Sequence, residues 1–300
     1  MPFIVDSILA IGLIIVAALS IANTRRFRRL ARRYHRLEKA ETDLMRLRQK
    51  VYASEANSAL TRAHEHPRTP IEFRSEFGED MLLWDLFGGQ TSGTCLEVGA
   101  FDGYHYSVSY AFDAVGWRCI LIEPLPDRHE QCLRRRTAAH VEHAALGPAG
   151  SSGTITFTAV KGREMLSHIA HEGMGTEHLR NIQRDSTTYE VSVPLTTMDA
   201  VLERSGATGL DFASIDVEGG EMSVLAGFTL ERWKPRALLI EDNSLGKRNE
   251  VADYLAARGY QEVARLAINR LYVRSDDAAL IARAKELAEI IHFPSPPIRK

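Results

Sequence analysis

Hydrophobic and polar positions divide the chain into three stretches. Residues 3–22 are almost uniformly apolar, interrupted by Asp6 and a few small residues. Residues 30–51 carry apolar side chains every seven positions among many charged ones. From about residue 69 onward, short apolar runs alternate with segments of helical periodicity, which is typical of an α/β domain. The pattern predicts a transmembrane anchor (1–24), an Arg-rich helical or coiled-coil linker (25–68) and an α/β domain (69–300).

The first apolar run is long enough to cross a bilayer as a helix, which takes about 20 residues. Arginines follow it directly from Arg25 to Arg33, and no Lys or Arg precedes it. By the positive-inside rule, these flanks predict a single-pass protein of a bacterial inner membrane with its α/β domain in the cytoplasm. A cleaved signal peptide would require a positive segment before the run, where Met1-Pro2 supplies only the terminal amine.

The second stretch has a seven-residue repeat. Apolar residues recur at Leu30, Leu37, Leu44 and Val51, with Ala40 and Leu47 at intervening positions and Arg33 interrupting the seam. This spacing suits a short coiled coil that joins two chains into a homodimer, or a helix lying on a membrane. A solvated, charged spacer helix fits the same residues equally well, so these interpretations stay open.

The third stretch predicts a doubly wound sheet. Apolar strands between amphipathic helices indicate a mostly parallel sheet of seven strands with helices on both faces, and a short final loop makes the last strand antiparallel. A hairpin over 154–160 and 189–195 interrupts the alternation. The predicted strands are 94–98, 117–122, 141–145, 212–217, 237–241, 260–266 and 270–274; the predicted helices are 79–87, 106–115, 127–136, 198–205, 221–228, 249–258 and 278–291.

Composition narrows the class of protein. The chain has 37 basic and 39 acidic residues, so no overall positive charge points to nucleic acid, and none is expected as a partner. Three cysteines, Cys95, Cys119 and Cys132, are too few and odd in number for a disulfide framework. They predict reduced thiols in a reducing compartment.

In doubly wound sheets, ligands bind beyond the carboxyl ends of the strands. The first strand ends in Glu97-Val98-Gly99-Ala100-Phe101-Asp102-Gly103, a glycine turn that lacks the G-x-G-x-x-G spacing of dinucleotide sites. Its acids disfavour phosphate and suit a cationic ligand with an amine. At the end of the second strand, Glu123 is placed to accept both hydroxyls of a ribose, and Pro124 stops the strand.

Two later strand ends are also acidic. Asp216 and Glu218 follow one strand, and Glu241 and Asp242 end the next. If these strands are neighbours, the four carboxylates converge, which is costly unless they bind a cation or share protons. They predict either a general base for an acceptor hydroxyl or a Mg²⁺ site of Asp216, Glu241 and Asp242.

Together these segments resemble the FkbM family of methyltransferases. The segments that carry the resemblance are 97–103, 122–124, 144–147 (Ala-Ala-Leu-Gly), 196–199 (Thr-Thr-Met-Asp) and 215–221 (Ile-Asp-Val-Glu-Gly-Gly-Glu), with 73–80 resembling the segment before the first strand. This chain departs from the family at Phe101, where a small polar residue is more common, and at Gly220, commonly Ala.

The resemblance implies a Rossmann-like class I methyltransferase fold that uses S-adenosylmethionine. The implied cofactor site comprises Glu97, Gly99, Ala100, Asp102, Gly103, Glu123, Pro124 and Asp216. Asp216 is expected as base or metal ligand, with Glu218 and Glu241 supporting it. The expected reaction is O-methylation of a sugar, glycolipid or other polyhydroxylated acceptor at the cytoplasmic face of a membrane.

Two rival functions share this fold pattern. A non-catalytic, membrane-anchored scaffold that binds protein partners is disfavoured, because a decayed site has no reason to keep the costly acids Glu123 and Asp216. A nucleotide-sugar or dinucleotide enzyme is disfavoured because its phosphate loop is missing. Fold alone does not separate these functions.

Overall fold

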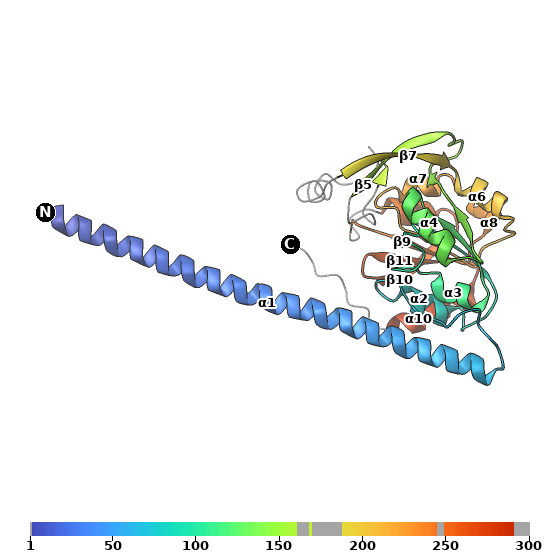
Figure 1. Cartoon of the computed structure of the whole chain (residues 1–300), viewed down its shortest axis with the longest axis horizontal. Helices are drawn as coiled ribbons and strands as arrows, with labels where there is room; N and C mark the ends of the chain where they lie inside the picture. The colour runs from blue at the N-terminus through green and yellow to red at the C-terminus, as the bar shows by residue number, and fades with distance from the viewer. Residues whose placement is uncertain (1, 161–167, 170–187, 245–248, 291–300) are drawn as a thin grey trace. The chain divides into compact units, whose positions relative to one another are not determined.

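The computed structural model describes residues 2–160, 168–169, 188–244 and 249–290. Contacts group the chain into two units, Met1–Arg48 and Gln49–Lys300. Helix α1 (Pro2–Arg62) runs through the first unit and into the second (Figure 1). The predicted helical linker (25–68) is therefore helical up to Arg62. Soon after, the chain turns at His64, which has a positive φ of 57°.

The structure contradicts the predicted membrane anchor. Within the part of the chain that the structure describes, no helix is long and apolar enough to cross a membrane. The described side chains of α1 begin at Arg29, and up to Lys50 charged residues recur in every turn, which a bilayer core does not tolerate. The backbone of residues 3–22 is helical, but their side chains lie outside the described part. The expected single-pass topology and its localisation are therefore wrong.

The second unit contains the predicted seven-stranded sheet, in the order β10-β11-β9-β8-β1-β2-β3. All neighbours are parallel except those of β11, which runs antiparallel to β10 and β9. This confirms the predicted mostly parallel sheet with an antiparallel last strand. The strands are β1 (Thr94–Val98), β2 (Arg118–Ile122), β3 (His140–Glu142), β8 (Phe212–Ile215), β9 (Ala237–Glu241), β10 (Tyr260–Leu266) and β11 (Asn269–Arg274).

Helices cover both faces of this sheet, because its central strands are apolar on both sides (Figure 1). One face packs on α6 (Met198–Ser205), α7 (Glu221–Leu225), α8 (Leu230–Trp233) and α9 (Glu250–Ala256), whose apolar residues join one buried cluster with the strands. The other carries α2 (Glu79–Leu86), α3 (Tyr110–Val115) and α10 (Ala278–Ile290), with an aromatic group that includes Trp84, Phe112 and Trp117. Helix α4 (Pro126–Arg135) contacts β3.

A second sheet has the order β4-β7-β5-β6. Its core is the predicted hairpin, β5 (Thr154–Val160) paired antiparallel with β7 (Thr188–Thr196), extended by β6 (His168–Ile169). The strand expected over 141–145 is two strands, because only its first half pairs with β2. After β3 the chain leaves the main sheet, and β4 (Ala145–Leu146) pairs with β7 instead.

The last turns of α1 belong to the second unit. Ala56 and Leu60 are buried, and the Tyr52 hydroxyl donates to Asp85 Oδ2 at 2.8 Å. Asn57 exchanges hydrogen bonds with the backbone of Ile71 in both directions. The compact unit that the contacts define therefore begins at Gln49, and the predicted α/β domain (69–300) lies within it.

Candidate active site

A cavity of about 420 Å³ opens at the carboxyl ends of β1, β2, β8 and β9. This is where a doubly wound sheet binds its ligand, and the volume lies in the usual range of small-molecule sites. The predicted residues that line it are Glu97, Gly99, Ala100, Glu123, Pro124, Asp216, Glu218 and Glu241. Three other predicted residues do not line it: Asp102, Gly103 and Asp242.

The turn after β1 depends on Gly99. Its φ is +82°, and a Cβ here would overlap the backbone carbonyl oxygen of Asp216. Only glycine permits both this conformation and this close approach between the ends of β1 and β8. The amides of Gly99 and Ala100 both donate to the carbonyl oxygen of Ile122, at 3.0 and 3.2 Å. The backbone of this turn is thus held open toward the cavity.

Glu97 holds the loop that follows this turn. Its carboxylate accepts hydrogen bonds from Ser107 Oγ at 2.8 Å, from the Val108 amide at 2.9 Å, and from both the amide and the hydroxyl of Ser109. Because residues 107–109 are bound in this way, α3 begins at Tyr110 rather than at the expected residue 106. Glu97 borders the cavity, but the hydrogen bonds to its carboxylate give it a positioning role.

Glu123 lines the cavity, and a backbone amide donates to each of its oxygens. The Leu125 amide donates to Oε1 and the Phe101 amide to Oε2, each at 2.8 Å. The side chain is buried, and burial raises its pKa to about 8, although the two amides act in the opposite direction. Each oxygen retains capacity for a further hydrogen bond. The carboxylate can therefore accept from the two hydroxyls of a vicinal diol such as a ribose.

Asp102 and Gly103 connect the turn to α4 instead of facing the cavity. Asp102 accepts from the Tyr104 and His105 amides and pairs with His105 Nδ1 at 2.6 Å and Arg135 at 2.5 Å. Burial opposes ionisation, but the bonds from His105 and Arg135 outweigh it and lower the pKa of Asp102. A Cβ on Gly103 would lie 3.0 Å from Arg136 Cγ, so this glycine permits close packing on α4.

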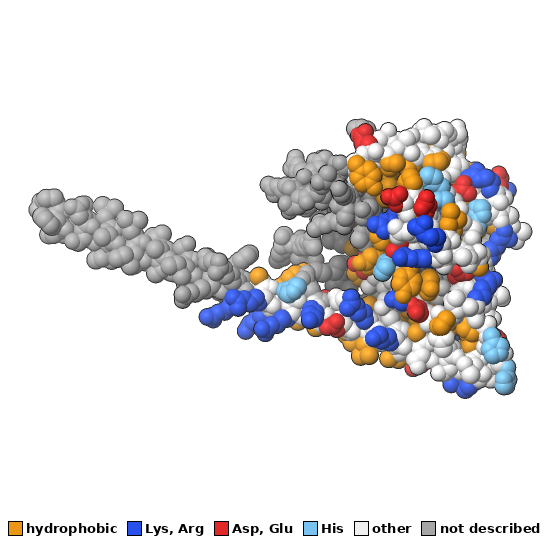
Figure 2. Space-filling view, in the orientation of Figure 1, with side chains coloured by type: hydrophobic (Ala, Val, Ile, Leu, Met, Phe, Trp, Pro, Cys, Tyr) orange, Lys and Arg blue, Asp and Glu red, His pale blue; other side chains and the backbone are white. Residues whose placement is uncertain are grey.

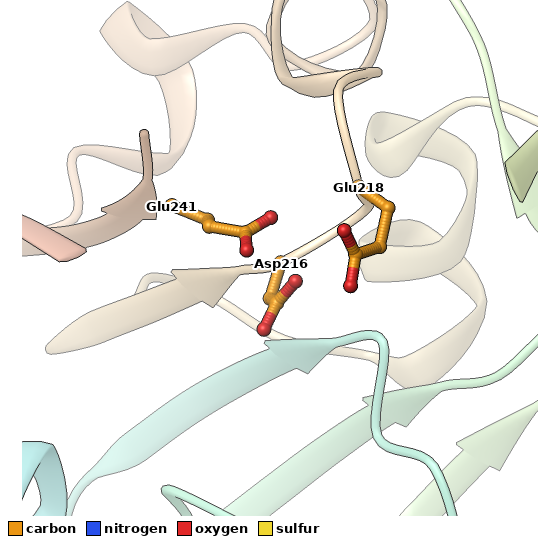
Figure 3. A group of neighbouring side chains, drawn as sticks. All are labelled: Asp216, Glu218 and Glu241. Atoms are coloured by element: carbon orange, nitrogen blue, oxygen red, sulfur yellow. The ribbon is translucent and has the colours of Figure 1, made fainter. Parts of the chain in front are cut away.

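Three carboxylates meet at the ends of β8 and β9. Asp216, Glu218 and Glu241 point toward one another, each with an oxygen within 4.8 Å of the others (Figure 3). Loss of water contact raises the pKa of all three, that of Glu218 to about 8, and repulsion from Asp216 further raises those of Glu218 and Glu241. Asp216 is open to the cavity and is hydrogen-bonded to Glu241. Oxygen Oε2 of Glu241 is buried and has no hydrogen-bond partner among the described residues.

Glu218 takes the place that the sequence assigned to Asp242. The chain leaves β8 at Ile215, and Glu218 reaches the group from a turn with a positive φ of 55°. Asn243 Nδ2 donates to Glu218 Oε2 at 3.3 Å. Asp242 instead pairs with Arg270 and accepts from the Ser244 amide at 3.0 Å. The structure thus brings Asp216 and Glu241 together with Glu218, without Asp242.

Two further acids border the cavity and were not predicted as site residues. Glu79 Oε1 accepts from Asn269 Nδ2 at 2.7 Å, and burial raises its pKa to about 7. The pKa of Glu76 is raised by burial and then by Asp216. Both lie within 73–80, a segment noted for its resemblance to the family. Acids just before or at the start of a helix are favoured by the helix dipole. The sequence therefore provided no separate reason to place Glu76 and Glu79 at the cavity.

Comparison with known families gives one match. A family model described as the methyltransferase FkbM domain matches residues 97–262, from β1 into β10. The match covers more than half of the 300 residues. No curated protein matches the chain.

Solved structures with a similar fold include several methyltransferases. The C-terminal domain of precorrin-6Y C5,15-methyltransferase from Rhodobacter capsulatus is 12% identical, over 65% of this chain and 85% of that one, with a TM-score of 0.31. A TehB-like methyltransferase from Corynebacterium glutamicum is 11% identical, over 76% and 98%, with a TM-score of 0.35. An O-methyltransferase from Bacillus cereus, solved with SAH, is 12% identical, over 80% and 78%, with a TM-score of 0.30. Because these structures are so distantly similar, the assignment of this chain to a family rests on its match to the family model.

Proposed function

Because this chain belongs to the FkbM family of S-adenosylmethionine-dependent methyltransferases, we propose that it methylates a hydroxyl group of a sugar, glycolipid or other polyhydroxylated acceptor. The main support for a hydroxyl group as the methyl acceptor is the position of the Asp216 carboxylate. It is open to the cavity beside the glycine turn and its pKa is raised. Such a group can take up the proton that a hydroxyl must lose on methylation.

The residues around the cavity fit S-adenosylmethionine. Glu123 would hold the two ribose hydroxyls. Gly99 permits the close approach of the ends of β1 and β8 that forms this side of the cavity. When bound, the cofactor supplies a methyl group on a positively charged sulfur. The acids around the turn favour that charge electrostatically.

Positioning the acceptor and removing its proton are the tasks of the carboxylates of this chain. As the new C–O bond forms and the C–S bond breaks, Asp216 accepts the hydroxyl proton. The hydrogen bond to Glu241 fixes the Asp216 carboxylate, and Asn243 orients Glu218 next to it. Holding the hydroxyl in line and removing its proton are the two contributions that this reaction needs from a protein.

The charge around the cavity supports an uncharged acceptor. Among the described residues that line it, the acids include Glu76, Glu79 and Glu218, Asn243 and Asn269 add amides, and no Lys or Arg is present. A phosphate or carboxylate on the bound part of the acceptor would find no Lys or Arg to pair with among these described residues. The hydroxyl groups of a sugar can donate hydrogen bonds to these carboxylates.

The chemistry of the three converging carboxylates also fits a divalent cation such as Mg²⁺, which prefers oxygen ligands. Asp216, Glu218 and Glu241 would be its protein ligands, and the unpartnered Oε2 of Glu241 supports this extension of the proposal. A cation there would lower the pKa of a bound hydroxyl.

The test measures S-adenosylhomocysteine release from the full chain with methyl glycosides, beside amino sugars of the same ring. Hydroxyl-only glycosides are expected to be turned over. Asp216→Asn, which keeps the shape but cannot take a proton, should lower kcat about 10²–10⁴-fold and leave cofactor affinity within about threefold. Asp276→Asn, at an exposed ion pair, is the matched control. Turnover restricted to amines, or full activity of Asp216→Asn, would contradict the proposal.

The same assay tests the cation. If Mg²⁺ is held by the three acids, chelation should abolish turnover and added Mg²⁺ should restore it. Glu218→Gln should then raise the Mg²⁺ concentration needed for half activity by about tenfold or more. Turnover that is insensitive to chelation would leave Asp216 acting as base without a cation.

A further inference from the structure

Helix α1 carries an exposed apolar stripe. Leu30, Leu37, Leu44 and Val51 are 55%, 63%, 58% and 47% exposed, and Leu47 beside them is 56% exposed. Because these residues recur every seven positions on one continuous helix, they lie along a single face. Such a contiguous apolar stripe on a helix indicates a face that another molecule covers.

Charged residues border the stripe in a regular pattern. Figure 2 shows Lys and Arg side chains along the described part of α1. If Leu30, Leu37 and Leu44 take the first seam position of each heptad, Arg36, Asp43 and Lys50 flank the seam on one side. Glu41, Arg48 and Glu55 flank it on the other, each five residues further along.

The five-residue offset is the spacing at which flanking residues of two parallel helices contact each other. In a parallel, in-register coiled coil, each flanking residue meets the partner's residue five positions later. Arg36 would meet Glu41, Asp43 would meet Arg48, and Lys50 would meet Glu55, so all three contacts join opposite charges. An antiparallel pair centred on Asp43 would instead set Asp43 against itself and Arg36 against Lys50.

We propose that the stripe binds a second copy of this chain, and that residues 30–55 form a parallel, in-register, two-stranded coiled coil. Charge complementarity identifies the second molecule as another copy of this chain. Of the parallel and antiparallel pairs compared above, only the parallel pair brings opposite charges together at every flanking contact. Arg33 stands in the seam opposite itself, so the pairing is tightest from Leu37 onward. This inference is independent of the proposed reaction.

Cross-linking of the full chain tests the seam. Leu37→Cys places a thiol on the stripe, and Lys39→Cys places one on the same turn away from it. The native cysteines are buried, so a short bifunctional maleimide reports on the added thiol. We expect at least tenfold more of the double-mass product from Leu37→Cys. Equal yields from both variants, or none from either, would overturn the seam.

Charge exchange tests the register. In the Leu37→Cys background, Arg36→Glu sets two acids against each other across the dimer and should lower the cross-linked fraction at limiting concentration about fivefold. Adding Glu41→Arg should return it to within about twofold of the starting yield. If Arg36→Glu has no effect, or the second change fails to rescue it, the parallel register is excluded. Circular dichroism on each variant shows whether α1 remains helical.

Discussion

Glu123 illustrates how one side chain can be prepared for a ligand before the ligand arrives. Its two oxygens are each held by one backbone amide at 2.8 Å, so the carboxylate cannot rotate away from the cavity. Burial keeps it largely protonated at neutral pH, with a pKa of about 8. Hydroxyl groups donate more strongly to the ionised form than to the neutral acid. Cofactor binding should therefore favour ionised Glu123.

This gives a pH-dependent binding prediction for Glu123. Because the ionised form binds ribose hydroxyls better, affinity for S-adenosylmethionine should rise as pH increases from 6 through about 8 and then level off. Glu123→Gln, which stays neutral, should bind about 10–100-fold more weakly at pH 8.5. Calorimetric titration of both proteins across the range measures this.

Comparing the two proteins removes the ligand's own ionisation from the result, since both bind the same ligand. The ratio of their affinities should widen with rising pH. A ratio that is constant from pH 6 to 9 would show that ionisation of Glu123 does not control binding.

At the scale of elements, the last turns of α1 matter most. Tyr52, Asn57 and Leu60 contact the rest of the second unit through a hydrogen bond to Asp85, paired bonds to Ile71 and buried apolar surface. Tyr52 also packs edge-on against Phe73, at 5.7 Å between ring centres. These contacts support the segment that leads into Glu76 and Glu79 at the cavity. The helix end is thus part of the catalytic unit's structure.

We predict that a chain beginning at Gln49 is as stable as the full chain, whereas one beginning at Arg68 is destabilised by about 3 kcal/mol. The loss combines the buried surface of Ala56 and Leu60 with the hydrogen bonds made by Tyr52 and Asn57. In a domain of this size the melting temperature should fall by roughly 6–12 °C. Calorimetry on both chains checks this. Equal melting temperatures would show that residues 49–67 are dispensable.

At the scale of the whole molecule, the second unit contains several acids that burial makes harder to ionise. The pKa of Glu79 is raised from 4.5 to about 7 and that of Glu123 from 4.5 to about 8. A folded state that holds protons more tightly than the unfolded chain gains stability at low pH. That contribution is complete below about pH 4.5 and is lost as pH rises through 7 and 8.

The free energy of unfolding without cofactor should therefore fall between pH 5.5 and 8.5, by about 2 kcal/mol from Glu79 alone. Urea titrations at the two pH values measure it. Glu79→Gln removes the titrating group and keeps one of the two oxygens that accept from the Phe77 amide and Asn269, so its stability should change less over this range. If the wild-type protein is equally stable at both values, or more stable at pH 8.5, the buried acids do not govern its stability.

The sequence by itself was sufficient for the order and type of the main elements and for the family. Strands such as Thr94–Val98 and Ala237–Glu241 begin and end where predicted, because apolar runs bounded by turn residues are local signals. The positions of the glycine turn and of Glu123 follow from the same rule, since both come directly after a buried strand. These features depend on residues close together in the chain.

Tertiary structure alone decided which acids face the cavity. Asp102 is next to the glycine turn, as a ligand residue would be, yet Arg135 on α4 draws it away. Asp242 directly follows Glu241 but pairs with Arg270 on β11, while Glu218 takes its expected place. The division of 141–145 between two sheets likewise depends on β7, far along the chain. Each outcome depends on a partner distant in sequence, and no local pattern of hydrophobic and polar residues contains that information.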